Sequence, residues 1–301
     1  MPRKNAFAAF GFSCLFTFTA ANVAHAAANP AGIAYRLTTN VSLYGKPTGM
    51  LVTGRCNRYD AAFAAARAKG GEVLAYLAPT QRPDHVVCTL DTKFYMNDIG
   101  RVPLWPYPSY GQRVSWPNTH MTDMRPGSAW ILTVVKYIEG LMIENKVDGV
   151  FLDTVNVRPW SKLAEWSSWP QWEKDRWAAG NVDLVKRLNA SRQRLRPNFI
   201  IMNNGIWDSK YTTAGLAGER YVDGVALEQP AYLSPWHVKY AGKPFCSCGH
   251  RRVLVIANTK TEAQGWAKVT GVTHVAAQSD SQLAYPPPPP VAFSPLRDRL
   301  D

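Results

Sequence analysis

The chain alternates short, continuously apolar runs with longer segments of helical periodicity. The runs have the length of buried strands and occupy residues 50–54, 72–77, 149–153, 199–203, 224–228, 253–257 and 272–276, with a weaker run at 120–124. Between them, residues 59–69, 129–145 and 172–195 read as helices; in 129–145, Ile131, Val134 and Ile138 share one face. Continuously apolar strands that alternate with helices are typical of parallel β-α units. The pattern predicts the α/β fold class, as a single-domain (β/α)8 TIM barrel.

The N-terminus differs from this pattern. Residues 1–26 begin with Arg3 and Lys4, continue in a mostly apolar run and end in Ala24-His25-Ala26. This is the three-part layout of a secretory signal peptide. The apolar run is too short, and too rich in serine, threonine and glycine, to span a membrane comfortably. We therefore expect a secreted or periplasmic protein with no membrane span in its mature form.

The C-terminus has low complexity. Five consecutive prolines at 286–290 cannot continue a helix or a central strand, and they favour polyproline II. Residues 281–301 are therefore predicted to be a tail outside the fold. This leaves residues 27–280 for the barrel, which is the usual size of one such domain.

The chain is basic, with a formal net charge of +12. Such a surface favours anionic partners such as acidic glycans, lipid headgroups or nucleic acid. The lysines and arginines are scattered, however, and no run of them resembles a nucleic-acid-binding arm. We interpret them as a solvated surface and expect no nucleic-acid partner.

Four cysteines follow the signal: Cys56, Cys88, Cys246 and Cys248. An even number in an exported chain indicates disulfides. Cys56 and Cys88 follow neighbouring predicted strands on the same face, so we expect them to pair, with Cys246 and Cys248 forming the second link. The alternative is a zinc site that also uses His250.

One internal repeat points to the chemistry. Residues 147–153 read Val-Asp-Gly-Val-Phe-Leu-Asp, and residues 222–228 read Val-Asp-Gly-Val-Ala-Leu-Glu. In each, an Asp-Gly turn begins a short apolar strand that ends in a carboxylic acid. These are the fourth and sixth predicted strands, and strands of one parity contribute inward side chains to the same layer. Asp153 and Glu228 should therefore stand at one height at the C-terminal mouth, where such barrels carry their active sites. The aspartates before each glycine are interpreted as turn residues.

Two carboxylates that face one cleft are what glycoside hydrolysis requires. One protonates the leaving oxygen, and the other attacks the anomeric carbon or activates water. We expect the oxygens of Asp153 and Glu228 within about 5–9 Å of each other, the range that spans retaining and inverting enzymes. Polar residues at strand ends and aromatic residues in the segments that follow suit a carbohydrate substrate. The predicted substrate-binding residues are Tyr76, Asp123, Asn203, Asn204, Trp105, Trp116, Trp207 and Tyr232.

Three segments together resemble a known group of enzymes. They read Gly-Glu-Val-Leu-Ala-Tyr-Leu-Ala at 71–78, Thr-Asp-Met-Arg at 122–125 and Val-Asp-Gly-Val-Phe-Leu-Asp-Thr at 147–154. They resemble the barrel of glycoside hydrolase family 114, which contains endo-acting polygalactosaminidase-like enzymes. They are also similar to related families grouped with the α-galactosidase superfamily. The resemblance covers most of residues 50–280, and the segment at 147–154 is its specific part.

The resemblance implies roles for the two acids. Asp153 would be the nucleophile and Glu228 the acid/base of a retaining enzyme that acts on a glycan such as an exopolysaccharide. Glu228 must then hold a proton near neutral pH, so we expect its pKa to be raised by Asp153 and by partial burial. The chain departs from the family at Asn156, where members often carry another aspartate. A polycationic galactosamine polymer also suits so basic a protein poorly.

Three alternatives compete with hydrolysis of glycans. A barrel that binds glycans without cleaving them has the same fold, and only the presence of both acids favours catalysis. Phosphate-binding barrel enzymes usually place glycine-rich loops after the seventh and eighth strands, and residues 258–261 and 278–281 contain none. A metal-dependent hydrolase needs clustered ligands, but the histidines are scattered. We assign no metal and no cofactor.

Overall fold

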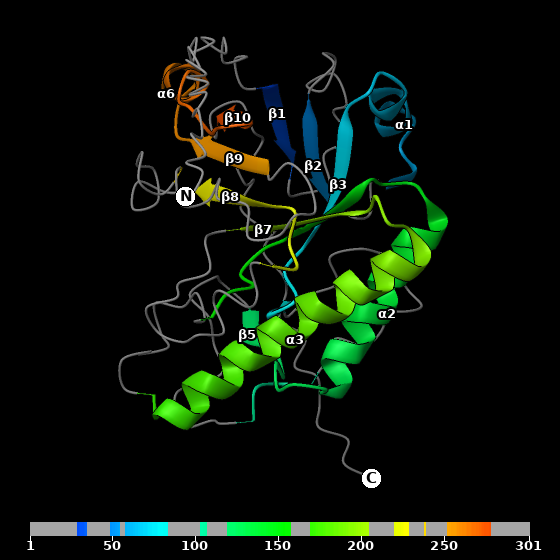
Figure 1. Cartoon of the computed structure of the whole chain (residues 1–301), viewed down its shortest axis with the longest axis vertical. Helices are drawn as coiled ribbons and strands as arrows, with labels where there is room; N and C mark the ends of the chain where they lie inside the picture. Colours follow the sequence, from blue (N-terminus) through cyan, green and yellow to red (C-terminus); the bar gives the residue numbers. More distant parts are fainter. Residues whose placement is uncertain are drawn as a thin grey trace, which may run out of the picture.

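The structure is a computed structural model, and it describes residues 29–34, 49–54, 58–83, 103–106, 119–157, 169–204, 220–228, 238 and 252–277. These residues form a closed barrel of parallel β-strands with α-helices outside it (Figure 1). A separate two-stranded antiparallel sheet lies outside the barrel. The predicted α/β class and the parallel barrel are confirmed.

The barrel strands follow one another around the barrel in chain order. They are β1 (Asn29–Ala34), β2 (Met50–Gly54), β3 (Glu72–Leu77), β6 (Gly149–Leu152), β7 (Ile200–Asn204), β8 (Gly224–Glu228), β9 (Arg252–Ala257) and β10 (His274–Ala277). Each strand is parallel to its neighbours, and β10 pairs with β1 to close the ring.

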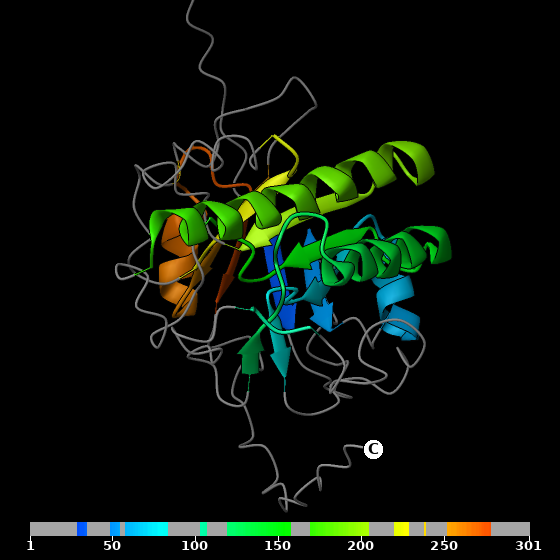
Figure 2. The ribbon, with the colours of Figure 1, turned by 90° about the horizontal axis from the view of Figure 1, so that it is seen from below.

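Four described helices lie outside the strands. They are α1 (Ala61–Ala68), α2 (Ala129–Glu144), α3 (Gln171–Leu195) and α6 (Lys260–Trp266). Figures 1 and 2 show α2 and α3 side by side along one flank, with α6 across the barrel from α1. The expected apolar face of α2 is confirmed, because Ile131, Val134 and Ile138 are all buried.

One predicted strand is wrong and one strand was missed. The weak apolar run at 120–124 is not part of the barrel; instead β5 (Thr119–Met121) pairs antiparallel with β4 (Gln81–Pro83). The barrel is completed by β1, whose sequence Asn-Pro-Ala-Gly-Ile-Ala contains a proline and a glycine, two residues that are depleted in strands. Because one strand is gained before β2 and one is lost after β3, β6 and β8 remain the fourth and sixth barrel strands.

Alternation along the strands divides the apolar residues into two cores. The inner core fills the barrel and contains Met50, Val52, Leu74, Phe151, Ile200, Met202, Ala226, Leu254, Ile256 and Ala276. The outer core lies between the strands and α2 and α3, and includes Val73, Val150 and Ile201. Since successive strand residues point to opposite sides, every second residue along a strand shares one core. This rule decides which strand-terminal side chains enter the mouth of the barrel.

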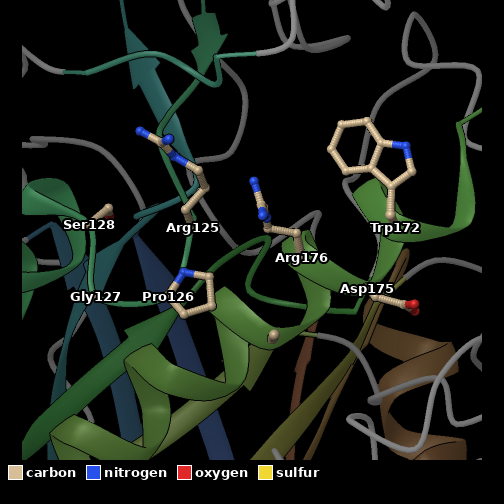
Figure 3. Close-up of a pocket in the computed structure, with 8 residues that line it drawn as sticks. Arg125, Pro126, Gly127, Ser128, Trp172, Asp175 and Arg176 are labelled. Carbon is tan, nitrogen blue, oxygen red and sulfur yellow. The ribbon is translucent and has the colours of Figure 1, made fainter.

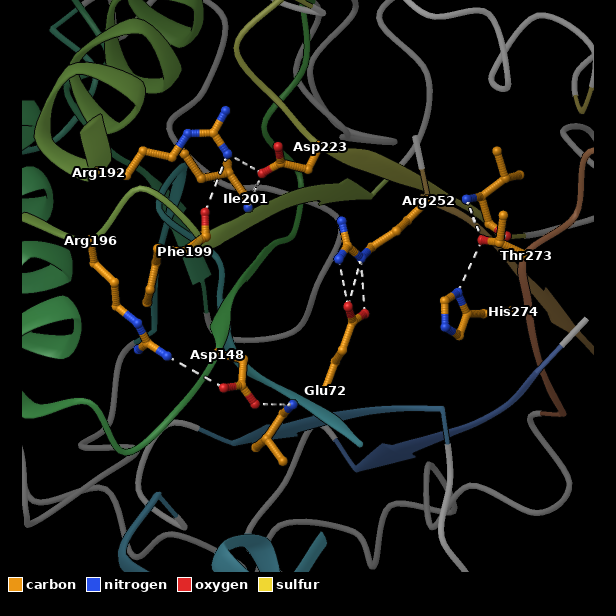
Figure 4. Close-up of polar contacts among 12 residues, drawn as sticks. Glu72, Asp148, Arg192, Arg196, Phe199, Ile201, Asp223, Arg252, Thr273 and His274 are labelled. Atoms are coloured by element: carbon orange, nitrogen blue, oxygen red, sulfur yellow. Dashed lines mark hydrogen bonds and ion pairs between the residues drawn. The ribbon is translucent and has the colours of Figure 1, made fainter. Parts of the chain in front are cut away.

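The two Asp-Gly segments join strands at the N-terminal end of the barrel (Figure 4). Asp148 accepts a hydrogen bond through Oδ2 from the backbone nitrogen of Val73 at 2.9 Å. Asp223 accepts one through Oδ2 from the backbone nitrogen of Ile201 at 2.8 Å. Arginines also pair with both carboxylates: Arg67 and Arg196 with Asp148, and Arg192 with Asp223. These aspartates do more than turn the chain, because each carboxylate ties its own segment to the preceding barrel strand.

The glycines of the same segments permit close strand packing. A Cβ on Gly224 would lie 2.5 Å from the carbonyl oxygen of Arg252, and a Cβ on Gly149 would clash with Ile200 in the same way. Beneath the inner core, Arg252 donates through Nε to Glu72 Oε2 at 2.9 Å, across the width of the barrel (Figure 4). The first half of the internal repeat is therefore explained by barrel construction, whereas its terminal acids are not.

Candidate active site

Four polar side chains stand at the C-terminal end of the inner core. Tyr76 lies near the end of β3, Asp153 directly follows β6, and Asn204 and Glu228 are the last residues of β7 and β8. Each lies two positions beyond an inner-core residue: Leu74, Phe151, Met202 and Ala226, respectively. Because side chains alternate along a strand, all four point into the mouth of the barrel.

The stagger of the strands brings the two acids to one height. Across β6 and β7, Leu152 pairs with Asn203, so Asp153 is level with Asn204. Asn204 in turn pairs with Ala226 on β8, which places Glu228 two residues further along its strand. A stagger of about one residue per strand is what the tilt of a (β/α)8 barrel produces. The two extra residues on β8 compensate for the tilt of the strands, so the carboxylates of Asp153 and Glu228 reach the same height at the mouth.

One amide group connects the two carboxylates. Asn204 Nδ2 donates a hydrogen bond to Asp153 Oδ1 at 2.9 Å and another to Glu228 Oε2 at 2.8 Å. Two oxygens that accept from one nitrogen at such distances are no more than about 6 Å apart. On the other side, the hydroxyl of Tyr76 donates to Asp153 Oδ2 at 2.5 Å. Both oxygens of Asp153 are therefore fixed by donors from the neighbouring barrel strands.

Opposing influences act on the charge of Asp153. Burial raises the pKa of this carboxyl above its ordinary value, because the charged form loses hydration. Hydrogen bonds from Tyr76, Asn204 and the backbone of Thr154 stabilise the carboxylate and lower the pKa in part. The net shift is upward. A raised pKa, in a carboxylate that also accepts specific hydrogen bonds at the mouth of a barrel, is typical of functional sites.

Thr154, directly after Asp153, has a backbone conformation that is rare for its residue type. Its φ is 61°, in the left-handed region that a β-branched residue seldom adopts. Thr154 Oγ1 donates to the carbonyl oxygen of Asp153 at 2.7 Å, and its hydroxyl also contacts that of Thr80. This conformation holds the Thr154 amide at the Asp153 carboxylate. Sequence reasoning missed both threonines, because nothing in the sequence pattern marks a strained position.

Two of the predicted binding residues lie elsewhere. Asn203 is fully buried, follows the outer-facing alternation of Ile201, and donates through Nδ2 to the carbonyl oxygen of Asn204 at 3.3 Å. Asp123 follows β5, outside the barrel sheet, and its Oδ2 pairs with Arg125 Nη2 at 2.8 Å. The prediction that the run at 120–124 is a barrel strand is wrong, because β5 belongs to the separate two-stranded sheet, so Asp123 does not stand at the end of a barrel strand. Asn204, rather than Asn203, spans the two acids.

Trp105 is not placed as a stacking platform. It is fully buried, donates through Nε1 to Glu173 Oε1 at 2.8 Å, and stacks on Trp169 with ring centroids 6.0 Å apart. Trp177 closes this cluster with an edge contact to Trp105 at 5.0 Å. Burial raises the pKa of Glu173, which sits fully enclosed beneath these rings. Trp105 therefore belongs to the packing between α3 and the segment before β5.

Several predictions concern residues outside the described part of the chain. The predicted aromatic platforms Trp116, Trp207 and Tyr232 lie there. So do the proposed signal peptide, the proline-rich tail, and the cysteines of both expected pairs at 56, 88, 246 and 248. Their roles stay predictions.

Neither a metal cluster nor a membrane-spanning helix occurs in the described part of the chain. Within it, no group of three or more His, Cys, Asp or Glu side chains is arranged to hold a metal ion. No helix among the same residues has the length and apolar character needed to cross a membrane.

Comparison with known proteins shows which solved structures share this fold. No protein-family model matches the sequence, and no curated protein is similar to it in sequence. Among solved structures, the chain is similar to the glycoside hydrolase domain of PelA from Pseudomonas aeruginosa, with a TM-score of 0.56 and 14% identity over 84% of this chain and 96% of that one. A variant of the same domain with one glutamate replaced by alanine gives a TM-score of 0.53 at 13% identity, with the same coverage.

A second group of similar structures is larger than this chain. The GH36 α-galactosidase AgaA from Geobacillus stearothermophilus, as a point variant in complex with 1-deoxygalactonojirimycin, matches with a TM-score of 0.51 and 8% identity. The match covers 83% of this chain and 39% of the α-galactosidase. At such low identities the similarity establishes the fold alone. The chain has the α/β-barrel fold of these TIM-barrel glycoside hydrolases.

Proposed function

We propose that the protein is a glycoside hydrolase that cleaves a glycosidic bond in a polysaccharide or oligosaccharide with two carboxylates. The observation that carries this proposal is the amide of Asn204, which bonds to Asp153 and Glu228 at once. It holds two acids face to face at the mouth of a barrel. The glycoside hydrolase neighbours support the proposal through their shared fold.

The distance between the acids supports a retaining mechanism. In retaining enzymes the carboxyl groups are about 5–5.5 Å apart, whereas inverting enzymes leave about 6.5–9.5 Å for a water molecule. The shared amide limits the nearest oxygens of Asp153 and Glu228 to about 6 Å. This spacing suits direct attack on the sugar rather than attack by an intervening water.

The reaction then runs in two steps. Asp153 attacks the anomeric carbon and forms an ester bond while the glycosidic bond breaks and Glu228 gives its proton to the leaving oxygen. In the second step Glu228 takes a proton from water, whose oxygen attacks the anomeric carbon and releases Asp153 as a carboxylate. Tyr76 and Asn204 keep Asp153 oriented and ionised between turnovers.

Burial suits Asp153 to the nucleophilic role. A carboxylate that is partly stripped of water is more basic than a hydrated one, and its raised pKa reflects that basicity. The three donors around it stabilise the charged form, which is the form that attacks. A barrel that only binds glycans does not require a buried carboxylate, whose charged form is destabilised by the loss of hydration. The arrangement therefore favours catalysis over binding alone.

The remaining assignments are part of the same proposal. We expect a carbohydrate substrate such as an exopolysaccharide, a catalytic domain at 27–280, and export through the signal at 1–26. Cleavage of a polysaccharide that is too large to enter a cell would take place where an exported enzyme works.

The test replaces each acid by its amide. Asp153→Asn and Glu228→Gln keep side-chain volume and remove the ionisable group, so each should lower turnover by at least about 10²-fold. Release of reducing ends is measured on a panel of microbial exopolysaccharides. Glu139→Gln on α2, where the acid pairs with Ser191 and Arg194, serves as the matched control and should stay active.

Thermal unfolding shows whether a loss of activity reflects a loss of fold. The pKa of Asp153 is raised in the folded state, so its charge lowers stability as the pH rises from the unfolded pKa through the folded one. At pH 7 the Asp153→Asn variant should therefore be at least as stable as the wild type. Near-native turnover in either amide variant would show that the acid has no catalytic role.

A further inference from the structure

A solvent-open pocket of about 650 Å³ lies between the segment that precedes α2 and the first turns of α3 (Figure 3). Its walls are Arg125, Pro126, Gly127 and Ser128 on one side and Trp172, Asp175, Arg176 and Ala179 on the other. α3 follows β6, and α2 follows the connection after β3, so both begin on the C-terminal side of the barrel. The pocket therefore lies on the same side of the barrel as the acids.

Trp172 gives the pocket an accessible aromatic face. Its side chain is 52% exposed, which is unusual for so large an apolar group. Arg176, one helical turn later, lies over the indole with its Cζ 5.9 Å from the ring centroid. Glu173 and Trp177 each follow one residue later, about 100° further around α3, and are buried in the tryptophan cluster. Of the two tryptophans on α3, Trp177 is therefore packed in the interior and Trp172 faces the pocket.

The side chain of Arg125 is held in position by the carboxylate of Asp123. Asp123, which is almost fully buried, accepts hydrogen bonds from the Nε of Arg125 at 2.9 Å and from its Nη2 at 2.8 Å. The same carboxylate accepts from the backbone nitrogen of Arg125 at 3.1 Å. A guanidinium fixed in this way loses little conformational entropy when it binds a ligand. In Figure 3, Arg125, Arg176 and Trp172 rise on the same side of the ribbon.

The chemistry of these groups defines the ligand. An indole face packs against the apolar face of a pyranose ring, while guanidinium groups offer only hydrogen-bond donors. Asp175 adds one acceptor, which lies 2.8 Å from Gln171 Nε2. The donors of the two guanidinium groups pair with hydroxyl and carboxylate oxygens and find no acceptor in an ammonium group, while Asp123 offsets the charge of Arg125. The net charge of +12 favours the same ligands.

We infer that this pocket is a second glycan-binding site, which takes a pyranose unit rich in hydroxyl or carboxylate oxygens and disfavours a cationic amino sugar. The inference rests on the proposed function for its biological role, because a long glycan would occupy the mouth and the pocket together. Binding at two linked points strengthens the hold on a polymer without new contacts at the first site. Short oligosaccharides, which reach only the mouth, gain nothing from the pocket.

The test measures binding separately from hydrolysis. Full-length protein carrying Asp153→Asn is titrated by calorimetry with polygalacturonate, with a neutral galactan and with chitosan, which represent acidic, neutral and cationic chains. Trp172→Ala and Arg176→Ala are each added to this background. Each should weaken binding to the acidic or neutral polymer roughly fivefold, which corresponds to about 1 kcal/mol. The control is Ile143→Ala, which removes an apolar side chain that is 71% exposed at the other end of α2.

The outcomes separate this inference from the catalytic proposal. Preferred binding to chitosan, unchanged binding in both pocket variants, or equal loss in Ile143→Ala would overturn the second site. In the active protein, Trp172→Ala should raise KM for a polymer and leave kcat and short-oligosaccharide turnover unchanged. Glycan binding that depends on Trp172 in a protein without hydrolytic activity would uphold the pocket and reject the enzyme. Polymer hydrolysis whose KM does not change in Trp172→Ala would uphold the enzyme and reject the pocket.

Discussion

At the scale of single residues, opposing effects act on the ionisation of the Asp153 carboxyl group. Burial disfavours its charge, and three donors favour it. Thr154 contributes one of these donors from a strained backbone, held by the threonine pair with Thr80. Strain of this kind costs about 1–3 kcal/mol and persists where the surroundings over-determine it. The cost is understandable if the position of the Asp153 carboxylate matters more than the stability of the strand end.

Tyr76→Phe tests the balance of charge on Asp153. The substitution removes the hydroxyl that donates to Asp153 Oδ2, so the pKa of Asp153 should rise further above its ordinary value. Because the nucleophile must be ionised, activity is lost as the pH falls through this pKa, and the acidic limb of kcat/KM should move to higher pH. Below the limb the rate should fall roughly tenfold, which corresponds to about 1.5 kcal/mol for a hydrogen bond to a charged group. An unchanged acidic limb would mean that another group titrates there.

Other residue-scale features followed from the sequence only in part. The internal repeat predicted that Asp153 and Glu228 stand together at the mouth, where Asn204 bonds to both, and their catalytic role stays a proposal. The choice between Asn203 and Asn204 required the register, since one residue decides whether a side chain enters the mouth or the outer core. The burial of Trp105 could not be predicted either, because the sequence pattern does not distinguish a buried tryptophan from an accessible one.

At the scale of elements, the strong apolar runs predicted the strands well. Residues 50–54, 72–77 and 224–228 are strands with those bounds. The failures involve short segments of weak pattern. β1 contains proline and glycine, and β5 is a three-residue strand that was mistaken for a barrel strand. Pairing partners far away in the chain decide such cases, and local periodicity carries no information about them.

The Asp-Gly starts of β6 and β8 lead to a prediction about stability. In Gly224→Ala, the new methyl group would meet the carbonyl oxygen of Arg252 at 2.5 Å, and the β8–β9 pairing must open to relieve the contact. We expect a loss of about 2 kcal/mol or more in the free energy of unfolding, measured with urea.

A second glycine provides the matched control for this experiment. Among the described residues, nothing lies within 4 Å of a Cβ built on Gly140, in the middle of α2. Gly140→Ala should therefore stabilise the protein, by about 0.5–1 kcal/mol, because alanine favours the helix. Similar effects of the two substitutions would show that close strand packing is not the reason for the glycine in the repeat.

At the scale of the whole molecule, construction and chemistry occupy opposite ends of the barrel. The N-terminal end carries the carboxylates of Asp148 and Asp223 and the Glu72–Arg252 pair, all engaged with arginines or backbone (Figure 4). The C-terminal end carries Tyr76, Asp153, Asn204 and Glu228, whose polar groups face the mouth. Functional sites in such barrels are found at the C-terminal end, and stabilising contacts at the other. The polarity of the molecule agrees with the proposed role of the acids.

The central claim is that Asp153 is the nucleophile and Glu228 the acid/base of a retaining glycosidase. Azide rescue tests it most directly, with an activated aryl glycoside of the sugar that the polysaccharide panel identifies. In Glu228→Ala, azide should attack the Asp153-linked sugar and release a glycosyl azide of retained configuration. In Asp153→Ala, azide should take the place of the missing carboxylate and give the inverted product. Proton NMR of the anomeric centre distinguishes the two, and the opposite assignment, or hydrolysis by the wild type with inversion, would contradict the account.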